Sequence, residues 1–220
     1  MKIGVCVTGE IRSFATHHTR ELLLNSILDL PNVSFVNFDL VKNTTCLNGL
    51  QLYKKKLCEK QKKYSEILNI STIKTDIRKK IKKFSLNIEE VSNCNSFSKS
   101  QCCVLNKTIP MGYFQYLRSD RCIRELFRTK NVSHVVRLRP EVLCDTKKIN
   151  FSNSCIRHMV HHEMQGDLLV VSSKRWMPFS GALKYMERTC VTNKVKMPSF
   201  PEYTLNCSSV NRNINCNILR

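Results

Sequence analysis

The first forty residues constrain the fold more than any other part of the chain, because they have the pattern of a strand, a helix and a second strand. Residues 2–8 form a short apolar run closed by Gly9, and Val33–Leu40 is a second run of the strand type. Between them, Ser13 is placed to cap a helix that ends before Pro31. A strand–helix–strand unit of this length is typical of the start of a parallel α/β sheet.

The later segments extend this pattern. Helices are predicted at 53–68, 70–84, 110–130 and 175–194, and strands at 134–138, near 158–160 and at 167–172. The chain has 220 residues, which is enough for one full domain with a sizeable core and short for two. No internal repeat and no linker interrupts it. We therefore predict a single α/β domain over residues 1–220, with a mostly parallel central sheet flanked by helices.

A formal net charge of +19 predicts attraction to polyanions such as nucleic acid, acidic surfaces or nucleotide phosphates. About half of this charge lies between Tyr53 and Phe84, so we expect a lysine-rich helical insertion at about 50–86. It is either a solvated face or a binding surface for acidic partners, including peripheral contact with acidic surfaces.

A basic nucleic-acid-binding module is the rival function. Few aromatic residues are interleaved with the basic ones and no nucleic-acid signature occurs, so no specific nucleic-acid partner is expected.

Twelve cysteines raise the question of disulfides or zinc. No two of them have C-x-x-C spacing, which disfavours a zinc finger, and scattered cysteines are predicted to be buried free thiols.

There is no run of about 18 apolar residues and no signal cleavage site, so no transmembrane segment and a cytoplasmic protein are expected. Sequons such as Asn32-Val33-Ser34 are expected by chance in an Asn- and Ser-rich chain, and matter only in a secretory lumen.

The segment Arg137-Leu138-Arg139-Pro140-Glu141 is the most informative candidate for a ligand site. Side chains alternate along a strand, so Arg137 and Arg139 are predicted to point the same way, about 7 Å apart. Two guanidiniums at a strand's carboxyl end can bind a diphosphate. Pro140 places Glu141 beyond the sheet, where a carboxylate can hold a divalent metal or orient a sugar hydroxyl. The plain alternative is a strand end with two ion-paired arginines.

A second candidate, Thr8-Gly9-Glu10-Ile11-Arg12, follows the first strand. It has neither the G-x-G-x-x-G nor the P-loop pattern, which disfavours dinucleotide and Walker-type phosphate binding. Gly9 still lets a ligand approach the backbone, the start of the next helix favours anions, and Arg12 adds a fixed charge. Because a strand–glycine–helix turn is common, this motif is informative only together with the other.

Together these motifs resemble small glycosyltransferases of the nucleotide-diphospho-sugar (GT-A-like) fold, found in bacterial polysaccharide loci, large DNA viruses and algae. Such proteins open with a strand and a Gly-x-x-Arg turn, and carry a later strand that ends in an Arg-x-Arg-Pro-Asp type motif. The matching segments are Gly9–Phe14, Gln115 and Cys122 on a helix, Arg137–Glu141, Gly166–Val170 and Pro201-Glu202. The resemblance implies a nucleotide-sugar-dependent transferase, with a nucleotide-sugar donor and a glycan or glycoprotein acceptor.

The candidate site residues are Thr8, Gly9, Arg12, Arg137 and Arg139 for the nucleotide sugar, Glu141 for a metal, and Asp167 and Glu202 for activating or positioning the acceptor hydroxyl. Glu141 departs from the family's Asp, and no Asp-x-Asp occurs in the chain. Glu141 is predicted to hold Mn²⁺ or Mg²⁺; the alternative is that the arginines neutralise the diphosphate alone. A catalytically inactive relative is the third alternative.

Overall fold

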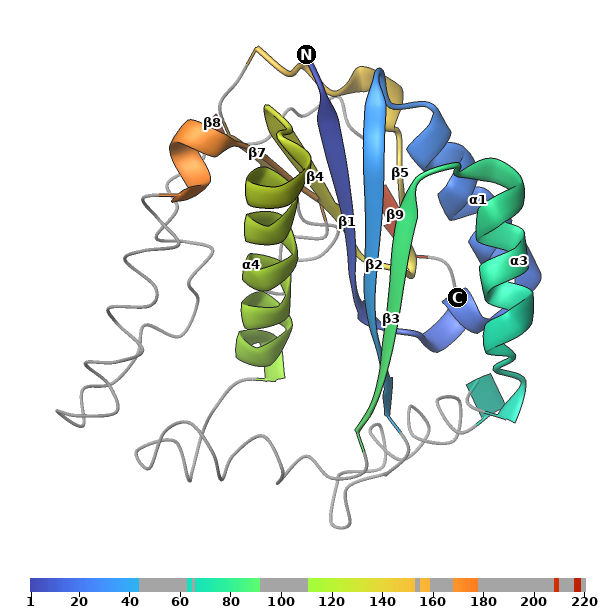
Figure 1. Cartoon of the computed structure of the whole chain (residues 1–220). Helices are drawn as coiled ribbons and strands as arrows, with labels where there is room; N and C mark the ends of the chain where they lie inside the picture. The colour runs from blue at the N-terminus through green and yellow to red at the C-terminus, as the bar shows by residue number, and fades with distance from the viewer. Residues whose placement is uncertain are drawn as a thin grey trace, which may run out of the picture.

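The computed structural model describes residues 1–43, 63–64, 66–91, 111–152, 155–158, 168–177, 208–209 and 216–218. A seven-stranded sheet with the order β3-β2-β1-β4-β7-β6-β8 forms the centre of this part of the chain (Figure 1). Its strands are β1 (Ile3–Glu10), β2 (Val33–Asn43), β3 (Phe84–Val91), β4 (His134–Leu138), β6 (Cys155–His158), β7 (Leu168–Ser172) and β8 (Ser208–Ser209). A separate two-stranded sheet pairs β5 (Val142–Cys144) with β9 (Cys216–Ile218).

The first four strands of this order are parallel to one another. β1 pairs with β2 and with β4, and β2 pairs with β3, all in parallel. β7 is antiparallel to both of its neighbours, β4 and β6. The predicted architecture, a mostly parallel sheet flanked by helices in a Rossmann-like α/β domain, is therefore confirmed.

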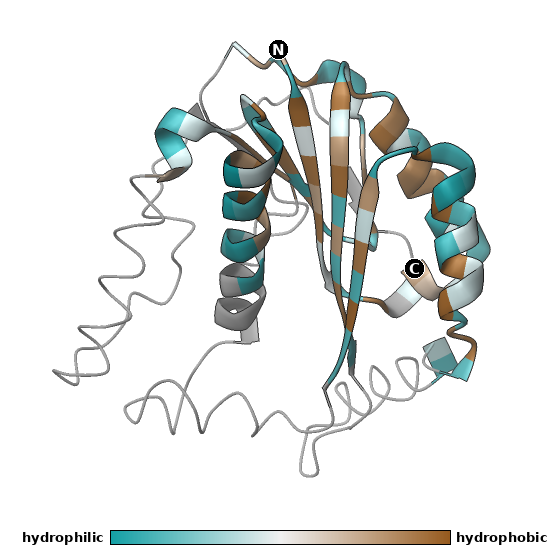
Figure 2. Ribbon diagram, viewed as in Figure 1, coloured by the Kyte–Doolittle hydropathy of each residue, from teal (hydrophilic) through white to brown (hydrophobic). Residues whose placement is uncertain are grey.

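Helices cover both faces of the sheet. α1 (His17–Leu28) and α3 (Ile70–Lys80) lie on one face, and α4 (Met111–Lys130) lies on the other (Figure 1). The strands show alternating bands of hydropathy, as expected when successive side chains point to opposite faces (Figure 2). The fully buried residues between the sheet and helices α1 and α3 include Val5, Val7, Phe38, Leu24, Ile73 and Ile77. Those between the sheet and α4 include Ile123, Val135 and Trp176.

Three local predictions need correction. Ser13 does not cap the first helix: a 3-10 turn, η1 (Arg12–Ala15), comes first, and Thr16 caps α1 by accepting a hydrogen bond from the Thr19 N–H. The helix expected to reach Phe84 ends at Lys80, and Phe84 opens β3. β3 was missed because Phe84 continues the helical spacing of Ile77 and Ile81, although Leu86 and Ile88 follow it with the alternation of a strand. The strand expected near 158–160 is β6, three residues earlier.

The lysine-rich segment is only partly described. Residues 51–62 lie outside the described residues, and α3 with the start of β3 accounts for 70–86. Ile73 and Ile77 of α3 are fully buried against the sheet, while the basic residues Arg78, Lys79 and Lys80 lie in its last turn. This part of the segment therefore forms the crossover between β2 and β3.

The expectation of free thiols is wrong for three cysteines. Cys6 of β1 and Cys122 of α4 form a disulfide with a Cα–Cα distance of 6.1 Å, and Cys144 is also disulfide-bonded. The Cys6–Cys122 disulfide could not be predicted from local spacing, because its two cysteines have a sequence separation of 116. None of the helices within the described ranges has the length and hydropathy of a membrane span.

Candidate functional site at the carboxyl edge of the sheet

The strand order creates a switch point between β1 and β4. From β1 the chain crosses to β2 and β3 on one side, and then returns through α4 to β4 on the other side. The crossover helices consequently lie on opposite faces, with α1 and α3 on one and α4 on the other (Figure 1). In open α/β sheets such a point leaves a crevice at the carboxyl ends of the two strands, where ligands bind. Both sequence motifs end there.

Gly9 is the second-last residue of β1 and is still paired with Leu40 of β2. Its φ of 147° lies in a region that side-chain-bearing residues rarely adopt, so glycine is needed for this backbone path. The chain is then held by a hydrogen bond from the Ile11 N–H to the Val41 carbonyl (2.9 Å) and enters η1. The backbone of Arg12 opens η1, and its side chain lies outside what the structure describes.

Thr8 and Arg137 connect the two sides of the switch point. The Arg137 Nε donates to the Thr8 Oγ1 at 3.1 Å, and the Thr8 hydroxyl shares a second hydrogen bond with the Ser119 hydroxyl of α4 (2.8 Å). Thr8 is fully buried and Arg137 is 3% exposed. Alternation along β4 therefore turns Arg137 towards α4. Its guanidinium is a fixed positive charge beneath the helix.

Asp39 is the centre of a second group of contacts. Asp39 lies on the face of β2 that is covered by α4, and it is 4% exposed. Arg118 and Arg121 of α4 donate to its two oxygens at 2.9 and 2.8 Å, and the Asn87 amide donates to it at 2.9 Å. Arg118 also pairs with Glu89 of β3 at 2.6 Å.

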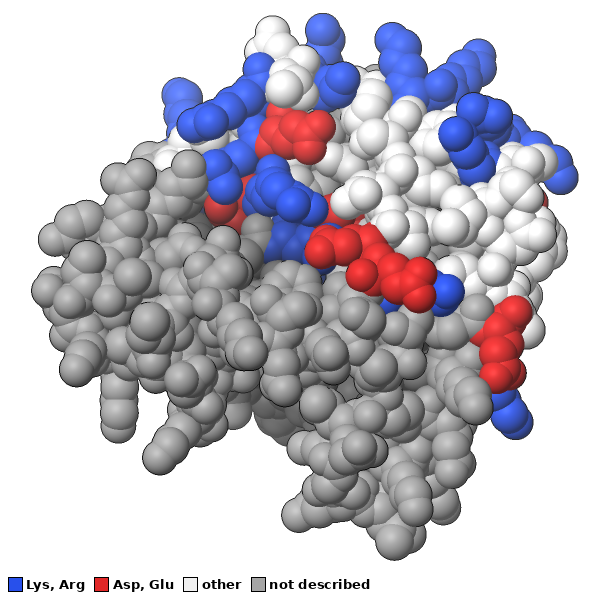
Figure 3. All heavy atoms as spheres, turned by 60° about the horizontal axis from the view of Figure 1, so that its bottom comes forward, with Lys and Arg blue, Asp and Glu red and all other residues white. Residues whose placement is uncertain are grey.

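We call Thr8, Asp39, Asn87, Glu89, Arg118, Ser119, Arg121 and Arg137 the carboxyl-edge cluster. Figure 3 shows acidic and basic side chains side by side on this edge of the molecule. The side chains of Arg121 and Glu89 are 58% and 43% exposed, so the buried contacts continue to the surface. The hydrogen bond to Asp39 raises the pKa of Arg121, against the opposite effect of its partial burial. The cluster thus presents permanently charged guanidiniums beside carboxylates.

Arg139 and Glu141 form an ion pair just beyond β4. Their side chains are 16% and 4% exposed, respectively. The Val142 N–H donates to the Arg139 carbonyl at 3.2 Å, which closes the turn through Pro140. Within the described ranges, no three His, Cys, Asp or Glu side chains are grouped closely enough to hold a metal ion. A divalent ion at Glu141 would therefore have to compete with Arg139, and the described residues do not form a complete metal site.

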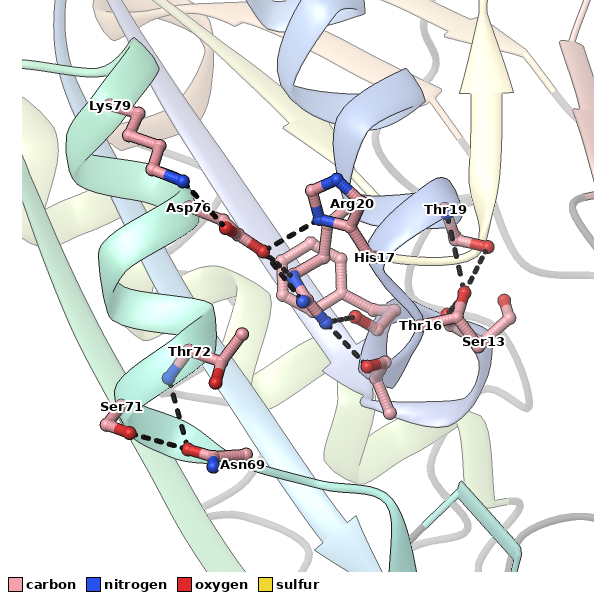
Figure 4. A network of polar contacts seen from close by, with 12 residues as sticks. Ser13, Thr16, His17, Thr19, Arg20, Asn69, Ser71, Thr72, Asp76 and Lys79 are labelled. Atoms are coloured by element: carbon pink, nitrogen blue, oxygen red, sulfur yellow. Dashed lines mark hydrogen bonds and ion pairs between the residues drawn. The ribbon is translucent and has the colours of Figure 1, made fainter.

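A buried ion pair holds the turn that follows Gly9 (Figure 4). The Arg20 Nη2 of α1 donates to the Asp76 Oδ2 of α3 at 2.7 Å, and Arg20 Nη1 also donates to the carbonyls of Phe14 (3.1 Å) and Ala15 (2.5 Å) in η1. Burial alone would raise the pKa of Asp76, but hydrogen bonds from Arg20 and His17 lower it below its usual value. This network positions η1, and with it the backbone after Gly9, from the opposite face of the sheet.

The structure brings together some of the predicted site residues. Thr8 and Arg137 are in contact, Gly9 adjoins them, and Arg139 with Glu141 follows directly along the chain. Asp167 and Glu202 lie outside the described residues.

The cluster also contains residues that sequence reasoning missed, chiefly Asp39, Arg118 and Arg121. Every second residue of β2 lies on the same face of the strand, and on this face the apolar Phe35 is followed by the polar Asn37 and Asp39. This change from apolar to polar in the sequence could have identified Asp39 as a candidate site residue.

No protein-family model matches the sequence, and no curated protein matches it either. Among solved structures, the glycosyltransferase GlyE of Streptococcus pneumoniae TIGR4 aligns with 96% of this chain at 12% identity and a TM-score of 0.39. The chain spans 45% of the length of that protein. HddC of Yersinia pseudotuberculosis aligns with 81% of this chain and 80% of its own, at 8% identity and a TM-score of 0.33.

A nucleoside-diphosphate-sugar pyrophosphorylase of Vibrio cholerae RC9 aligns with 92% of this chain and 86% of its own, at 8% identity and a TM-score of 0.35. Likeness at this level does not assign an activity. The fold described above rests on strand order and helix placement, and the site rests on its own contacts.

Proposed function

We propose that this chain is a glycosyltransferase that moves a sugar from a nucleotide-diphospho-sugar to an acceptor hydroxyl of a glycan or glycoprotein. One observation carries the proposal: the Arg137–Thr8 contact lies across the β1–β4 switch point, with Gly9 next to Thr8 near the end of β1 and Arg139 just after the end of β4. Ligands of open α/β sheets bind at such a point, and an arginine pair beside a glycine turn suits a diphosphate attached to a nucleoside.

The chemistry assigns separate roles to these groups. Glycosyl transfer breaks the bond between the sugar's anomeric carbon and the diphosphate oxygen, and forms a bond from that carbon to the acceptor oxygen. Negative charge develops on the departing nucleoside diphosphate. In the proposal, Arg137 stabilises this charge from beneath α4 and Arg139 does so from the loop, exchanging Glu141 for a phosphate oxygen. Gly9 and Arg12 contact the nucleotide, and Asp167 or Glu202 accepts the hydroxyl proton.

The test measures binding by calorimetry against a panel of nucleotide-diphospho-sugars, with and without Mn²⁺, and transfer by release of free nucleoside diphosphate. Arg139→Ala is expected to weaken binding by about 1.5–3 kcal/mol, the size of a charge-assisted hydrogen bond, which is roughly 10- to 150-fold in Kd. Arg128→Ala is the matched control, because Arg128 is exposed in the last turn of α4, away from this edge.

Removing Arg139 also takes an ion-pair partner from the buried Glu141 and can destabilise the fold. The double variant Arg139→Ala, Glu141→Gln therefore separates loss of binding from loss of folding. Glu141→Gln alone tests the metal. If Glu141 holds Mn²⁺ or Mg²⁺, turnover and the response to divalent ions fall together; if the arginines act alone, activity remains. Binding without turnover in the wild type would favour the inactive relative. Wild-type binding by all of these variants would remove the main support for the proposal.

A further inference from the structure

The disulfides change what the chain's glycosylation sequons mean. Cys6–Cys122 joins β1 to α4, and Cys144 of β5 is bonded as well, in a strand whose register places Cys216 of β9 directly opposite it. Disulfides form and persist in oxidising compartments and are rare in the reducing cytosol. Two bonded positions in separate sheets therefore point to folding in an oxidising compartment, which in eukaryotic cells is also where asparagine is glycosylated.

Sequons of the Asn-x-Ser/Thr type are more frequent in this chain than its composition explains. The chain contains 19 asparagines and 33 serines and threonines among 220 residues, and random order would give about three sequons. There are seven, at Asn32, Asn43, Asn69, Asn106, Asn131, Asn150 and Asn206. The expectation that chance alone accounts for them therefore needs revision.

Three of these asparagines lie at the amino edge of the sheet. Asn32 is exposed in the turn before β2, and its carbonyl accepts from the Ile3 N–H (3.2 Å) at the start of β1. Asn131 is exposed in the turn between α4 and β4, where the neighbouring Ser133 N–H donates to the Lys2 carbonyl (2.9 Å). Asn150 is exposed beside Phe151, whose ring contacts that of His134, the first residue of β4, at 5.9 Å.

The local geometry at these positions suits a bulky attachment. Asn32 and Asn131 have φ values of 51° and 49°, the left-handed conformation of tight surface turns, and neither is covered by a helix. The Asn150 side-chain oxygen accepts from the Ser152 N–H (3.0 Å) in a surface turn, whereas that of Asn69 caps the helix α3 by accepting from the Thr72 N–H at 3.1 Å. Figure 1 shows that the turns before β2 and β4 lie at the end of the sheet opposite the carboxyl edge. Glycans there would leave the carboxyl-edge cluster and both helical faces uncovered.

We propose that Asn32, Asn131 and Asn150 are N-glycosylation sites, used in the oxidising compartment in which the Cys6–Cys122 disulfide forms. The donor is a lipid-diphosphate-linked oligosaccharide. The asparagine Nδ2 forms a bond to its anomeric carbon and loses a proton to a base of the transferring enzyme, while the lipid diphosphate leaves with the electron pair of the broken carbon–oxygen bond. The proposal concerns this chain as an acceptor, and it holds or fails independently of the proposed function.

The deciding experiment uses the protein isolated from the cells that naturally make it. Enzymatic deglycosylation in ¹⁸O-water, followed by peptide mass spectrometry, converts each occupied asparagine to an ¹⁸O-labelled aspartate. Labelled peptides are expected for Asn32, Asn131 and Asn150, and a non-reducing digest should contain the Cys6–Cys122 linked peptide. Unmodified asparagines at all three positions would overturn the proposal, whether or not the disulfide is present.

A second measurement tests each site in the full chain directed into the secretory lumen of a eukaryotic host. Ser34→Ala, Ser133→Ala and Ser152→Ala each remove a sequon without touching its asparagine. Each is expected to lose one glycan, seen as one step in gel mobility that deglycosylation abolishes. The matched controls are Ser34→Thr, Ser133→Thr and Ser152→Thr, which keep the hydroxyl and the sequon. An alanine variant with the same mobility as its threonine control would exclude that site.

Discussion

The two faces of the sheet use the same kinds of side chain for different purposes. Beneath α1 and α3, Asp76 and Arg20 form an ion pair whose side chains are only 6% and 3% exposed, and the exposed side chains of His17 and Lys79 lie on its outer side. Beneath α4, Asp39 also pairs with arginine, but Arg121 is 58% exposed and the contacts extend to the surface at Glu89. A buried pair is costly to open and serves to hold elements together, whereas a pair that reaches the surface can exchange partners with a ligand. Four predictions test this difference.

Arg20→Ala should have the largest effect on stability. It leaves the Asp76 carboxylate buried without its main partner and removes the donor to the Phe14 and Ala15 carbonyls. We expect a loss of about 3–5 kcal/mol in the free energy of unfolding, measured by urea denaturation. Lys79→Ala is the control, since Lys79 is 69% exposed and 3.9 Å from Asp76, and it should cost less than about 0.5 kcal/mol. Equal effects would mean that the buried pair holds nothing.

Removal of the Cys6–Cys122 disulfide should loosen the α4 face selectively. The double variant Cys6→Ala, Cys122→Ala opens a loop with a sequence separation of 116 and should cost about 2–5 kcal/mol. Hydrogen exchange should then show faster exchange of α4 amides at the carboxyl-edge cluster, while α1 and α3 keep their protection. Uniform loss of protection over both faces would contradict the separation of the two regions.

Arg118 and Arg121 offer a comparison within the carboxyl-edge cluster. The Arg118 side chain is 8% exposed and contacts both Asp39 and Glu89, so Arg118→Ala should destabilise the fold by about 2–4 kcal/mol. Arg121→Ala should cost under about 1 kcal/mol, because its guanidinium is largely in water. If the cluster binds a nucleotide sugar, Arg121→Ala should still weaken that binding. Thermal unfolding with and without ligand measures both effects, and the reverse order of stabilities would contradict this assignment.

The smallest expected effect is the acid dependence of the Arg20–Asp76 pair. The pKa of Asp76 is lower in the folded chain than its ordinary value of 3.8. Its contribution to stability is therefore complete above about pH 4 and is lost as the pH falls through the folded value. Unfolding free energies measured between pH 7 and pH 2 should fall less steeply at the acid end for Asp76→Asn than for the wild type. Parallel curves would mean that Asp76 titrates normally.

The sequence by itself determined the elements that depend on local pattern. The apolar run of β1, the helix α1 to Leu28 and the strand β4 followed from period and from proline alone, although β1 continues through Gly9 to Glu10 instead of closing there. Strand–helix–strand order then predicted a parallel α/β sheet, because crossover connections leave few other arrangements. The Gly9 and Arg137 motifs were also identified at this level.

Only the tertiary structure decided which distant residues meet. Asp39 and Arg118 are 79 residues apart, and Cys6 and Cys122 are 116 apart. The sheet beneath α4 supplies Asp39, which pairs with Arg118 and leaves the Arg118 side chain only 8% exposed. The spacing of residues in the sequence shows which of them share one face of a helix or strand. Whether a charged residue on that face is solvated or forms a buried ion pair depends on the element that packs against it. Asp76 and Asp39 are therefore both buried carboxylates, and the elements packed against them decide that Arg20 of α1 pairs with the first and Arg118 of α4 with the second.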